Sequence, residues 1–391
     1  MNELLKKLEG DRLIWLVVTI LSMLSILVVY SAAGSLAYKN VGGNTEHYLI
    51  RHATLVGIAL IAMYICHKVD YIYYSRLSRY ALLISIPMLA FTWFFGSEVN
   101  SASRWIEIPF LHYTFQPSDL AKLALITNMA SMLWKRQRNI QEFKNSIIPL
   151  LIWTGVICGL IGLSDVSTAS LLFLTIMLLL FIGRVPVKYL GMLVGIGILA
   201  GLFAYHFGQR GDTATSRLSS FIGNSEVPYQ AQQSFIAIAT GGVTGKGIGQ
   251  STQRNFLPHS YSDFIFAIIV EEYGFIGGFG IIILYLIMLY RGMMVAARSR
   301  EAFGGLLAAG LVFSLILQAF VHMAVVVGLM PLTGLPLPLL SMGGTSLLFT
   351  GMGIGIILSV SRGPQNENAY RKPVAVRSKD NQNRPMNVPL G

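Results

Sequence analysis

One carboxylate, Asp263, stands where a long polar segment meets an apolar run, and it is the best candidate for chemistry. The segment from 226 to 277 is rich in glycine, polar and aromatic residues, and it lies between two hydrophobic stretches. Long loops between rigid elements commonly carry function. A lone carboxylate suits proton abstraction. The structural alternative is a helix cap, because an aspartate just before a helix stabilises its free N–H groups.

Other ionisable residues lie inside or beside apolar runs, where a charge is costly. Glu271 and Glu272 follow Asp263 by about two turns, and we expect one of them to pair with a cation in the bundle. Lys122 and Asp165 fall at similar predicted depths, so we expect them to pair with each other. Such a pair is either structural or orients a substrate, and the sequence leaves both interpretations open.

The glycine-rich run GGVTGKGIGQ begins at residue 241 and contains Lys246. It does not fit the phosphate-binding pattern GxxxxGK[ST], since Gly247 follows the lysine. A plain turn is the default interpretation, and the alternative is a loop that brings backbone amides and Lys246 near an anionic group. We expect no nucleotide here.

The composition indicates a polytopic membrane protein. Of 391 residues, 54% are hydrophobic and only 12% are charged, which leaves too little polar surface for a soluble globule of this size. The formal net charge of +11 arises from short basic clusters beside apolar spans, so the positive-inside rule explains it better than nucleic-acid binding does. Cys66 and Cys158 both lie within apolar spans and form no disulfide or metal-binding pattern.

The apolar pattern predicts an all-α integral membrane protein with ten transmembrane helices, since a span needs about 20 mostly apolar residues. The first is a retained helix rather than a signal peptide, because its apolar run is too long. The expected spans are 13–33, 50–67, 80–96, 117–134, 146–163, 166–183, 189–207, 263–290, 304–327 and 343–361.

With the N-terminus in the cytoplasm, most basic residues fall on the inner side, which favours ten spans and two cytoplasmic termini. The chain then divides into a cytoplasmic N-terminus (1–12), a membrane domain (13–361) and a polar, disordered cytoplasmic tail (362–391). The large outer loop, 208–262, joins the seventh and eighth helices. Together with 97–116 and the proline-rich 328–342, it is expected to converge on one outward-facing site.

Five stretches resemble the SEDS (shape, elongation, division and sporulation) family, which includes the FtsW, RodA and SpoVE proteins. They occur in the family's order and cover most of the membrane domain. The stretches are SASRWIEIPFLHYTFQPSDLAKL (101–123), SDVSTA (164–169), YQAQQSFIAIATGGVTGKGIGQ (229–250), LPHSYSDFIFAIIVEEYGFIG (257–277) and GLMPLTGLPLPLLSMGGTSLL (328–348).

The resemblance implies a glycosyltransferase that polymerises lipid II into glycan strands at the outer face of the bacterial cytoplasmic membrane. It implies that Asp263 is the catalytic carboxylate and that Lys122 and Asp165 match family residues of functional weight. It also supports a divalent cation, Mg²⁺ or Mn²⁺, held by Asp263 and pyrophosphate oxygens. The remaining candidates for binding or supporting the substrate are Arg104, Arg210, Arg217, Lys246 and Glu272.

Three departures from the family pattern stand out. His259 and Tyr261 occupy positions where the family usually has glutamate and histidine, so the role of that glutamate does not carry over. SDVST replaces a PDLGT-like motif without loss of the charge at Asp165. Met342 replaces a tyrosine in the last outer loop.

The resemblance further implies a class B penicillin-binding protein as partner, together with other division or elongation proteins and membrane lipid. The modest length and basic tail favour the division type. Two other functions remain open: a flippase for the same lipid-linked precursor, or a scaffold without activity. A flippase needs polar groups through the membrane, whereas a catalyst needs its acid at an outer surface, and the placement of Asp263 favours the catalyst.

Overall fold

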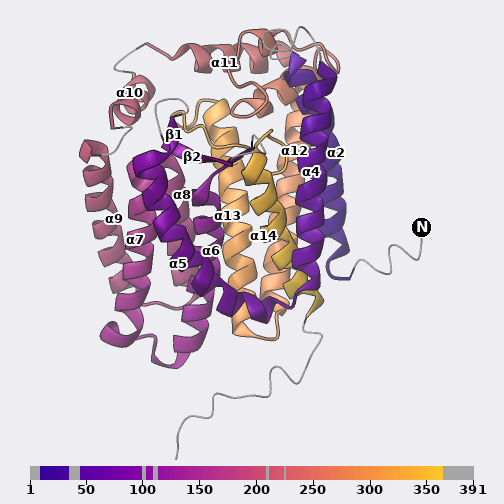
Figure 1. The fold of residues 1–391 in the computed structure, drawn as a ribbon. Coiled ribbons are helices and arrows are strands. Elements are labelled where there is room, and N and C mark those ends of the chain that lie inside the picture. Colours follow the sequence, from indigo (N-terminus) through magenta and orange to yellow (C-terminus); the bar gives the residue numbers. More distant parts are fainter. Residues whose placement is uncertain are drawn as a thin grey trace, which may run out of the picture.

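The computed structural model describes residues 9–34, 45–98, 103–108, 113–207, 211–223 and 226–363. Its long helices run roughly side by side in a bundle, and shorter helices lie across one end (Figure 1). The long helices are α2 (Arg12–Ala32), α4 (Thr45–Lys68), α5 (Tyr71–Phe95), α6 (Pro117–Arg136), α7 (Ile148–Ser164), α8 (Val166–Ile182), α9 (Val187–Phe207), α12 (Ile265–Arg298), α13 (Ala302–Val326) and α14 (Gly344–Arg362).

Shorter elements connect the long helices. The segment between α5 and α6 forms a small antiparallel sheet of order β1-β2-β3, in which Ile106 of β2 is paired with Phe115 of β3. The described part of the segment between α9 and α12 contains two α-helices and one 3-10 helix. The short elements are β1 (Ser97–Glu98), β2 (Ser103–Ile108), β3 (Tyr113–Phe115), η1 (Gln137–Asn139), the π-helical η2 (Phe143–Ile147), α10 (Gly211–Ile222), α11 (Tyr229–Gly241) and η3 (Gln253–Asn255).

The helices begin where the sequence supplies the appropriate groups. Asp11 caps α2 by accepting hydrogen bonds from the N–H groups of Leu13 and Ile14. Pro117 opens α6, where its missing N–H costs nothing. Asp165 caps α8 through the N–H of Thr168. Local capping therefore sets boundaries that apolar patterning leaves approximate.

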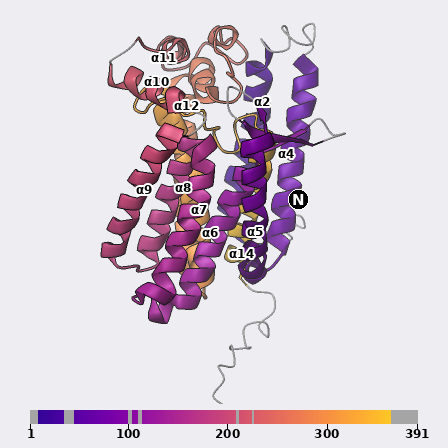
Figure 2. The same cartoon turned by 60° about the vertical axis from the view of Figure 1, so that its left-hand side comes forward.

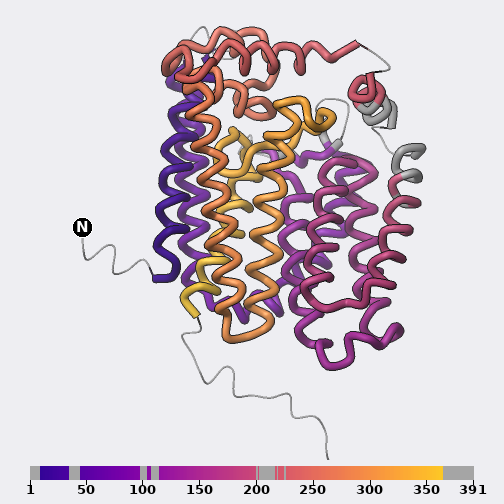
Figure 3. The backbone as a smooth tube through the Cα atoms, turned by 180° about the vertical axis from the view of Figure 1, so that it is seen from behind, coloured from indigo at the N-terminus to yellow at the C-terminus, as the bar shows by residue number. Residues whose placement is uncertain are grey.

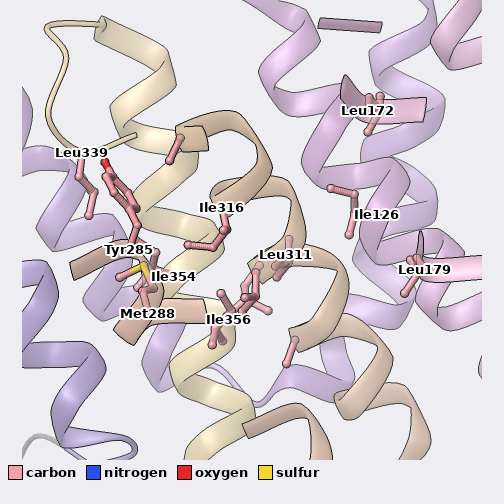
Figure 4. Packing of buried hydrophobic residues seen from close by; sticks show 14 of the residues in the cluster. Ile126, Leu172, Leu179, Tyr285, Met288, Leu311, Ile316, Leu339, Ile354 and Ile356 are labelled. Carbon is pink, nitrogen blue, oxygen red and sulfur yellow. The ribbon is translucent and has the colours of Figure 1, made fainter. Parts of the chain in front are cut away.

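The core runs through the centre of the bundle, around α13. This helix packs against α6, α8, α12 and α14. Buried aliphatic side chains such as Leu311 and Ile316 of α13 and Ile354 of α14 fill the space beside Tyr285 of α12 (Figure 4). At the periphery, α9 packs mainly against α7, α8 and α10 (Figure 2).

The outer surface of the bundle is apolar, as expected for lipid contact. Large hydrophobic side chains such as Ile61, Phe94 and Leu199 are exposed on α4, α5 and α9. Within the described residues, seven helices are long and apolar enough to cross a membrane, and α8 and the described apolar part of α9 are shorter apolar helices. The all-α membrane class is thus confirmed. Ten helices occur at the ten predicted positions, while ten crossings remain a prediction.

Gly274 breaks α12 in two. Its φ of +70° and ψ of −170° are not helical, and a φ of this sign favours glycine. The part before the break, residues 265–273, is here called the short arm, and residues 275–298 the long arm. A Cβ placed on Gly278 would lie 2.9 Å from Cγ2 of Val270, so the arms fold against each other. The predicted span over 263–290 is therefore helical but contains a break that the apolar pattern does not indicate.

The two ends of the bundle differ. At one end, here called the loop end, the chain from α10 to the short arm gathers over the helices (Figure 3). The opposite end, here called the basic end, carries the start of α2 and the end of α14 (Figure 1). Many of the described residues at the basic end are arginines and lysines. They include Arg12, Lys68, Arg76, Arg79, Lys135, Arg136, Arg138, Lys144, Arg184, Lys188, Arg291, Arg298, Arg300 and Arg362.

Candidate active site at the loop end of the bundle

Asp263 lies in a tight, half-buried turn directly before the short arm. Its backbone N–H donates to the carbonyl oxygen of His259 at 3.0 Å. The hydroxyl of Ser262 donates to Oδ1 of Asp263 at 2.6 Å. Among the described residues, no cation forms an ion pair with this carboxylate. The turn therefore orients the carboxylate, which forms no ion pair with a described side chain.

The helix-cap interpretation of Asp263 is wrong. The N-cap of α12 is Phe264, and no side-chain hydrogen bond caps this helix. A capping aspartate would accept a hydrogen bond from the second or third N–H of the helix. The carboxylate thus has no structural task of that kind.

The proline-rich loop 328–343 packs onto this turn. Ser341 Oγ donates to the carbonyl oxygen of Ser262 at 2.6 Å, and the N–H of Met342 donates to that of Tyr261 at 2.9 Å. A Cβ placed on Gly334 would lie 3.5 Å from Oδ2 of Asp263. Two of the departures from the family pattern, Tyr261 and Met342, are therefore in backbone contact beside the candidate catalytic carboxylate.

Two polar residues of α13, which the sequence analysis did not single out, hold this loop in place. Gln318 Nε2 donates to the carbonyl oxygen of Pro336 at 2.8 Å, and Nδ1 of His322 lies 2.7 Å from the carbonyl oxygen of Leu335. Extended prolines leave carbonyl groups that need donors inside a bundle. Gln318 and His322 are one helical turn apart in an otherwise apolar helix, and this spacing is the sequence signal that could identify them.

A cavity of about 380 Å³ is lined in part by residues 330–335 of the same proline-rich loop. Asp165 and Arg217 supply its charged groups. Its remaining lining, from α8, α13 and the proline-rich loop, consists of Val166, Ser167, Ser170, Leu171, Leu174, Val321, Met330, Pro331, Leu332, Thr333 and Leu335. A largely apolar cavity with a few convergent charges is a typical ligand site.

The expected ion pair between Lys122 and Asp165 is wrong, because each residue has another partner. Arg104 of β2 donates to Oδ2 of Asp165, which also accepts from the hydroxyl of Thr168 at 2.9 Å. Lys122 pairs instead with Asp119, one turn earlier on α6, at 2.8 Å. Each charge is neutralised at close range, which a buried charge requires.

Arg217 of α10 links the cavity to Asp263. Its Nη1 donates to the carbonyl oxygen of Leu332 at 3.0 Å. Burial lowers the pKa of this guanidinium, and the carboxylates of Asp165 and Asp263 oppose that shift. Arg104, Asp165 and Asp263 thus all lie within electrostatic reach of Arg217.

The glycine-rich run is a structural loop packed on the break in α12. The N–H groups of Lys246 and Gly247 donate to the carbonyl oxygens of Glu271 and Glu272, at 2.9 and 3.0 Å. A Cβ on Gly245 would overlap the Glu272 carbonyl. These backbone donors are used internally, which favours the plain turn over the anion-binding alternative.

The glutamates of the short arm hold this loop. Lys246 Nζ lies 2.6 Å from Oε1 of Glu271, which is fully buried, and this confirms that one glutamate pairs with a cation. The neighbouring Glu272 accepts from the hydroxyl of Ser31 and from the N–H of Ser251 at 3.3 Å. Lys246 and Glu272 therefore act in the scaffold here, apart from the cavity. Arg210 lies outside the described residues.

Comparison with known proteins gives a consistent result. The sequence model of the FtsW/RodA/SpoVE family, described as "Cell cycle protein", matches residues 11–366. A probable peptidoglycan glycosyltransferase FtsW from Geobacter sp. (strain M18) is 34% identical over 91% of this chain and 98% of its own length. Stage V sporulation protein E of Bacillus subtilis (strain 168) is 32% identical over 91% of this chain and 98% of its own.

Solved structures share the fold. A peptidoglycan synthase complex, described as coordinating polymerization and crosslinking, contains a chain with a TM-score of 0.70 and 25% identity, covering 90% of this chain and 98% of that one. The rod shape determining protein RodA of Thermus thermophilus gives a TM-score of 0.66 and 25% identity, covering 90% and 97%. With a family match over nearly the whole described region and relatives above 30% identity, the chain belongs to the FtsW/RodA/SpoVE family of integral membrane proteins.

Proposed function

We propose that this protein is a peptidoglycan glycosyltransferase that polymerises lipid II into glycan strands at the outer face of the bacterial cytoplasmic membrane. The curated relatives with this activity in their names, FtsW proteins of two Geobacter strains, support the reaction class. The observation that carries the proposal is Asp263, a carboxylate in a fixed turn that neither caps a helix nor pairs with a cation among the described residues.

The proposed reaction joins the 4-hydroxyl of an acceptor sugar to the anomeric carbon of a donor, and a lipid pyrophosphate leaves. Asp263 takes the proton of the acceptor hydroxyl as the new bond forms, which needs a carboxylate that is ionised and accessible. Arg217, and Arg104 beside Asp165, place positive charge near the cavity, where the departing pyrophosphate gains negative charge. Positioning of the two sugars supplies the rest.

A divalent cation, Mg²⁺ or Mn²⁺, fits this site only in combination with the substrate. The described residues contain no group of three His, Cys, Asp or Glu that could form a complete protein site. Magnesium is commonly held by one or two carboxylates together with substrate phosphates, and Asp263 is the available carboxylate. The ion would supply positive charge beside the leaving pyrophosphate.

The proposed orientation puts the loop end outside and the basic end, with both termini, in the cytoplasm. The uneven distribution of arginine and lysine supports it. The division into a short N-terminus, a membrane domain over 13–361 and a tail from 362 follows the same topology. In cells without an outer permeability barrier, an impermeant thiol reagent should label Phe256→Cys and not Asn139→Cys in a background free of Cys66 and Cys158. Labelling of residue 139 instead would reverse the orientation.

The proposed partner is a class B penicillin-binding protein, whose transpeptidase crosslinks the new strands. The neighbour described as a peptidoglycan synthase complex supports a membrane-bound partner of this kind. FtsW and SpoVE relatives support a role in division or sporulation rather than elongation, alongside other proteins of the division complex.

The direct test is polymerisation of purified lipid II by the purified protein, with and without the penicillin-binding partner. We expect glycan strands on a gel, with more or longer products when the partner is present. A protein that moves lipid II across vesicle bilayers without forming polymer would be a flippase. A protein that does neither, yet binds the partner, would be a scaffold.

A further inference from the structure

A second cavity, of about 550 Å³, opens at the basic end, far along the bundle from Asp263. It lies between the start of α2, the end of α12 and the end of α14. Its lining includes five arginines and a single carboxylate: Arg12, Arg291, Arg298, Arg300, Arg362 and Asp11. A concave surface lined by one sign of charge concentrates the potential inside it and attracts counter-ions.

Described residues neutralise only part of this positive charge. Arg291 Nε donates to Oδ2 of Asp11 at 2.9 Å, and Nη2 of Arg362 to Oδ1 of Asp70 at 2.8 Å. Within the part of the chain that the structure describes, neither Arg12 nor Arg298 makes a hydrogen bond or ion pair. The cavity therefore carries positive charge that the described chain does not balance.

A purely structural explanation covers only some of these arginines. Arg298 and Arg362 lie in the last turns of α12 and α14, where the helix dipole favours a cation. Arg12 is the first residue of α2, where the dipole disfavours one. Arg12 is exposed and lines the same cavity as Arg298, and the helix dipole does not explain its position.

Exposed apolar side chains surround this cavity. Leu13, which lines the cavity, and Leu16 are exposed on α2 at 43% and 53% of their surface, and Tyr290 on α12 at 63%. The helices α2 and α12 pack side by side. The arginines thus lie at the level where the lipid-facing apolar surface ends, which is the depth of phospholipid headgroups, while acyl chains can follow the apolar side chains.

We propose that this cavity binds the phosphate group of an anionic phospholipid from the inner leaflet, through Arg12 and Arg298. Phosphate oxygens match guanidinium groups in charge and in hydrogen-bonding geometry. The bound lipid ties together the ends of two helices, α2 and α12. It stabilises the bundle from the end opposite the candidate active site, and this holds whether or not the proposed reaction is correct.

The test compares lipids added to the purified, delipidated protein in neutral detergent. Phosphatidylglycerol or cardiolipin should raise the unfolding temperature, phosphatidylcholine should not, and native mass spectrometry should show the anionic lipid retained. In the double variant Arg12→Gln, Arg298→Gln, affinity for phosphatidylglycerol should fall roughly thirtyfold, since each arginine near an anionic surface contributes about a factor of five. Glutamine keeps an uncharged polar side chain and breaks no ion pair that the structure contains.

A matched control is the double variant Arg138→Gln, Lys188→Gln, which removes the same charge from exposed sites at the same end but outside the cavity. It should bind phosphatidylglycerol like the wild type. Inorganic phosphate at matched concentrations separates a soluble anion from a lipid. An equal stabilisation by inorganic phosphate, unchanged lipid binding by the Arg12/Arg298 variant, or an equal loss in the control would each overturn the proposal.

Discussion

The ion pair between Arg104 and Asp165 offers a quantitative test of the site. Its side chains are 16% and 8% exposed, so removing one partner leaves a largely buried charge. Breaking a fully buried pair costs about 3–5 kcal/mol, and a hydrogen bond to a charged group contributes about 1.5–3 kcal/mol. Because the arginine side chain remains partly exposed to solvent, we expect Arg104→Ala to lower the free energy of unfolding by roughly 2–4 kcal/mol.

Asp165→Ala loses the same pair and also the cap of α8, a further contribution of about 1 kcal/mol. The double variant should be less destabilised than the sum of the two single ones, with a coupling energy of about 2–3 kcal/mol. The assay is equilibrium unfolding in mixed micelles with increasing sodium dodecyl sulfate. Combining Lys122→Ala with Asp165→Ala should give additive losses within about 0.5 kcal/mol. A coupling above about 1 kcal/mol for that pair, or none for Arg104 and Asp165, would refute the observed pairing.

Two further predictions concern the scaffold at the break in α12. Gly274→Ala should destabilise the protein by roughly 2–5 kcal/mol in the same unfolding assay, because its positive φ strains any L side chain and a Cβ there would overlap the Val243 carbonyl. Gly280→Ala, with no atom within 4 Å of the new methyl, should be near neutral, and equal effects would contradict the argument. Lys246→Met leaves a buried carboxylate without its cation and should lower the free energy of unfolding by about 1–3 kcal/mol. Polymerisation per folded molecule should remain close to wild type. A selective loss of turnover would instead indicate that this lysine contacts the substrate.

The sequence predicts the helices well because lipid contact imposes a strong requirement. A bilayer needs about 20 apolar residues per crossing, and the long helices occur at every predicted position. The position of Asp263 beside a converging proline-rich loop also follows from the sequence, since two loops at one end of a bundle must meet. The sequence does not predict that this carboxylate leaves the helix uncapped. The N-cap position falls on Phe264, one residue after Asp263, and a shift of one residue decides whether an aspartate can cap.

The pairing of charges is where sequence reasoning fails. Estimated depth alone pairs Asp165 with Lys122, but the partner of Asp165 comes from a β-strand whose path the apolar pattern does not determine. Asp119 was within reach of Lys122 by helical spacing, three residues away, and this signal was available. Gly274 is distinguished from the other glycines of the same run by the loop from 241 to 250, which packs against it. Predicting the break therefore requires three-dimensional information.

The role of Asp263 is tested most directly by Asp263→Asn in the lipid II polymerisation assay. The amide keeps the size of the side chain and can still accept from Ser262, but it cannot take the acceptor's proton. Ser262→Ala is the matched control, because it removes the neighbouring hydroxyl and leaves the carboxylate; it should retain substantial turnover. We expect the asparagine variant to insert in the membrane, unfold at the wild-type temperature and bind its penicillin-binding partner, while glycan polymerisation falls to background. Polymerisation near the wild-type rate by that variant would contradict the catalytic assignment.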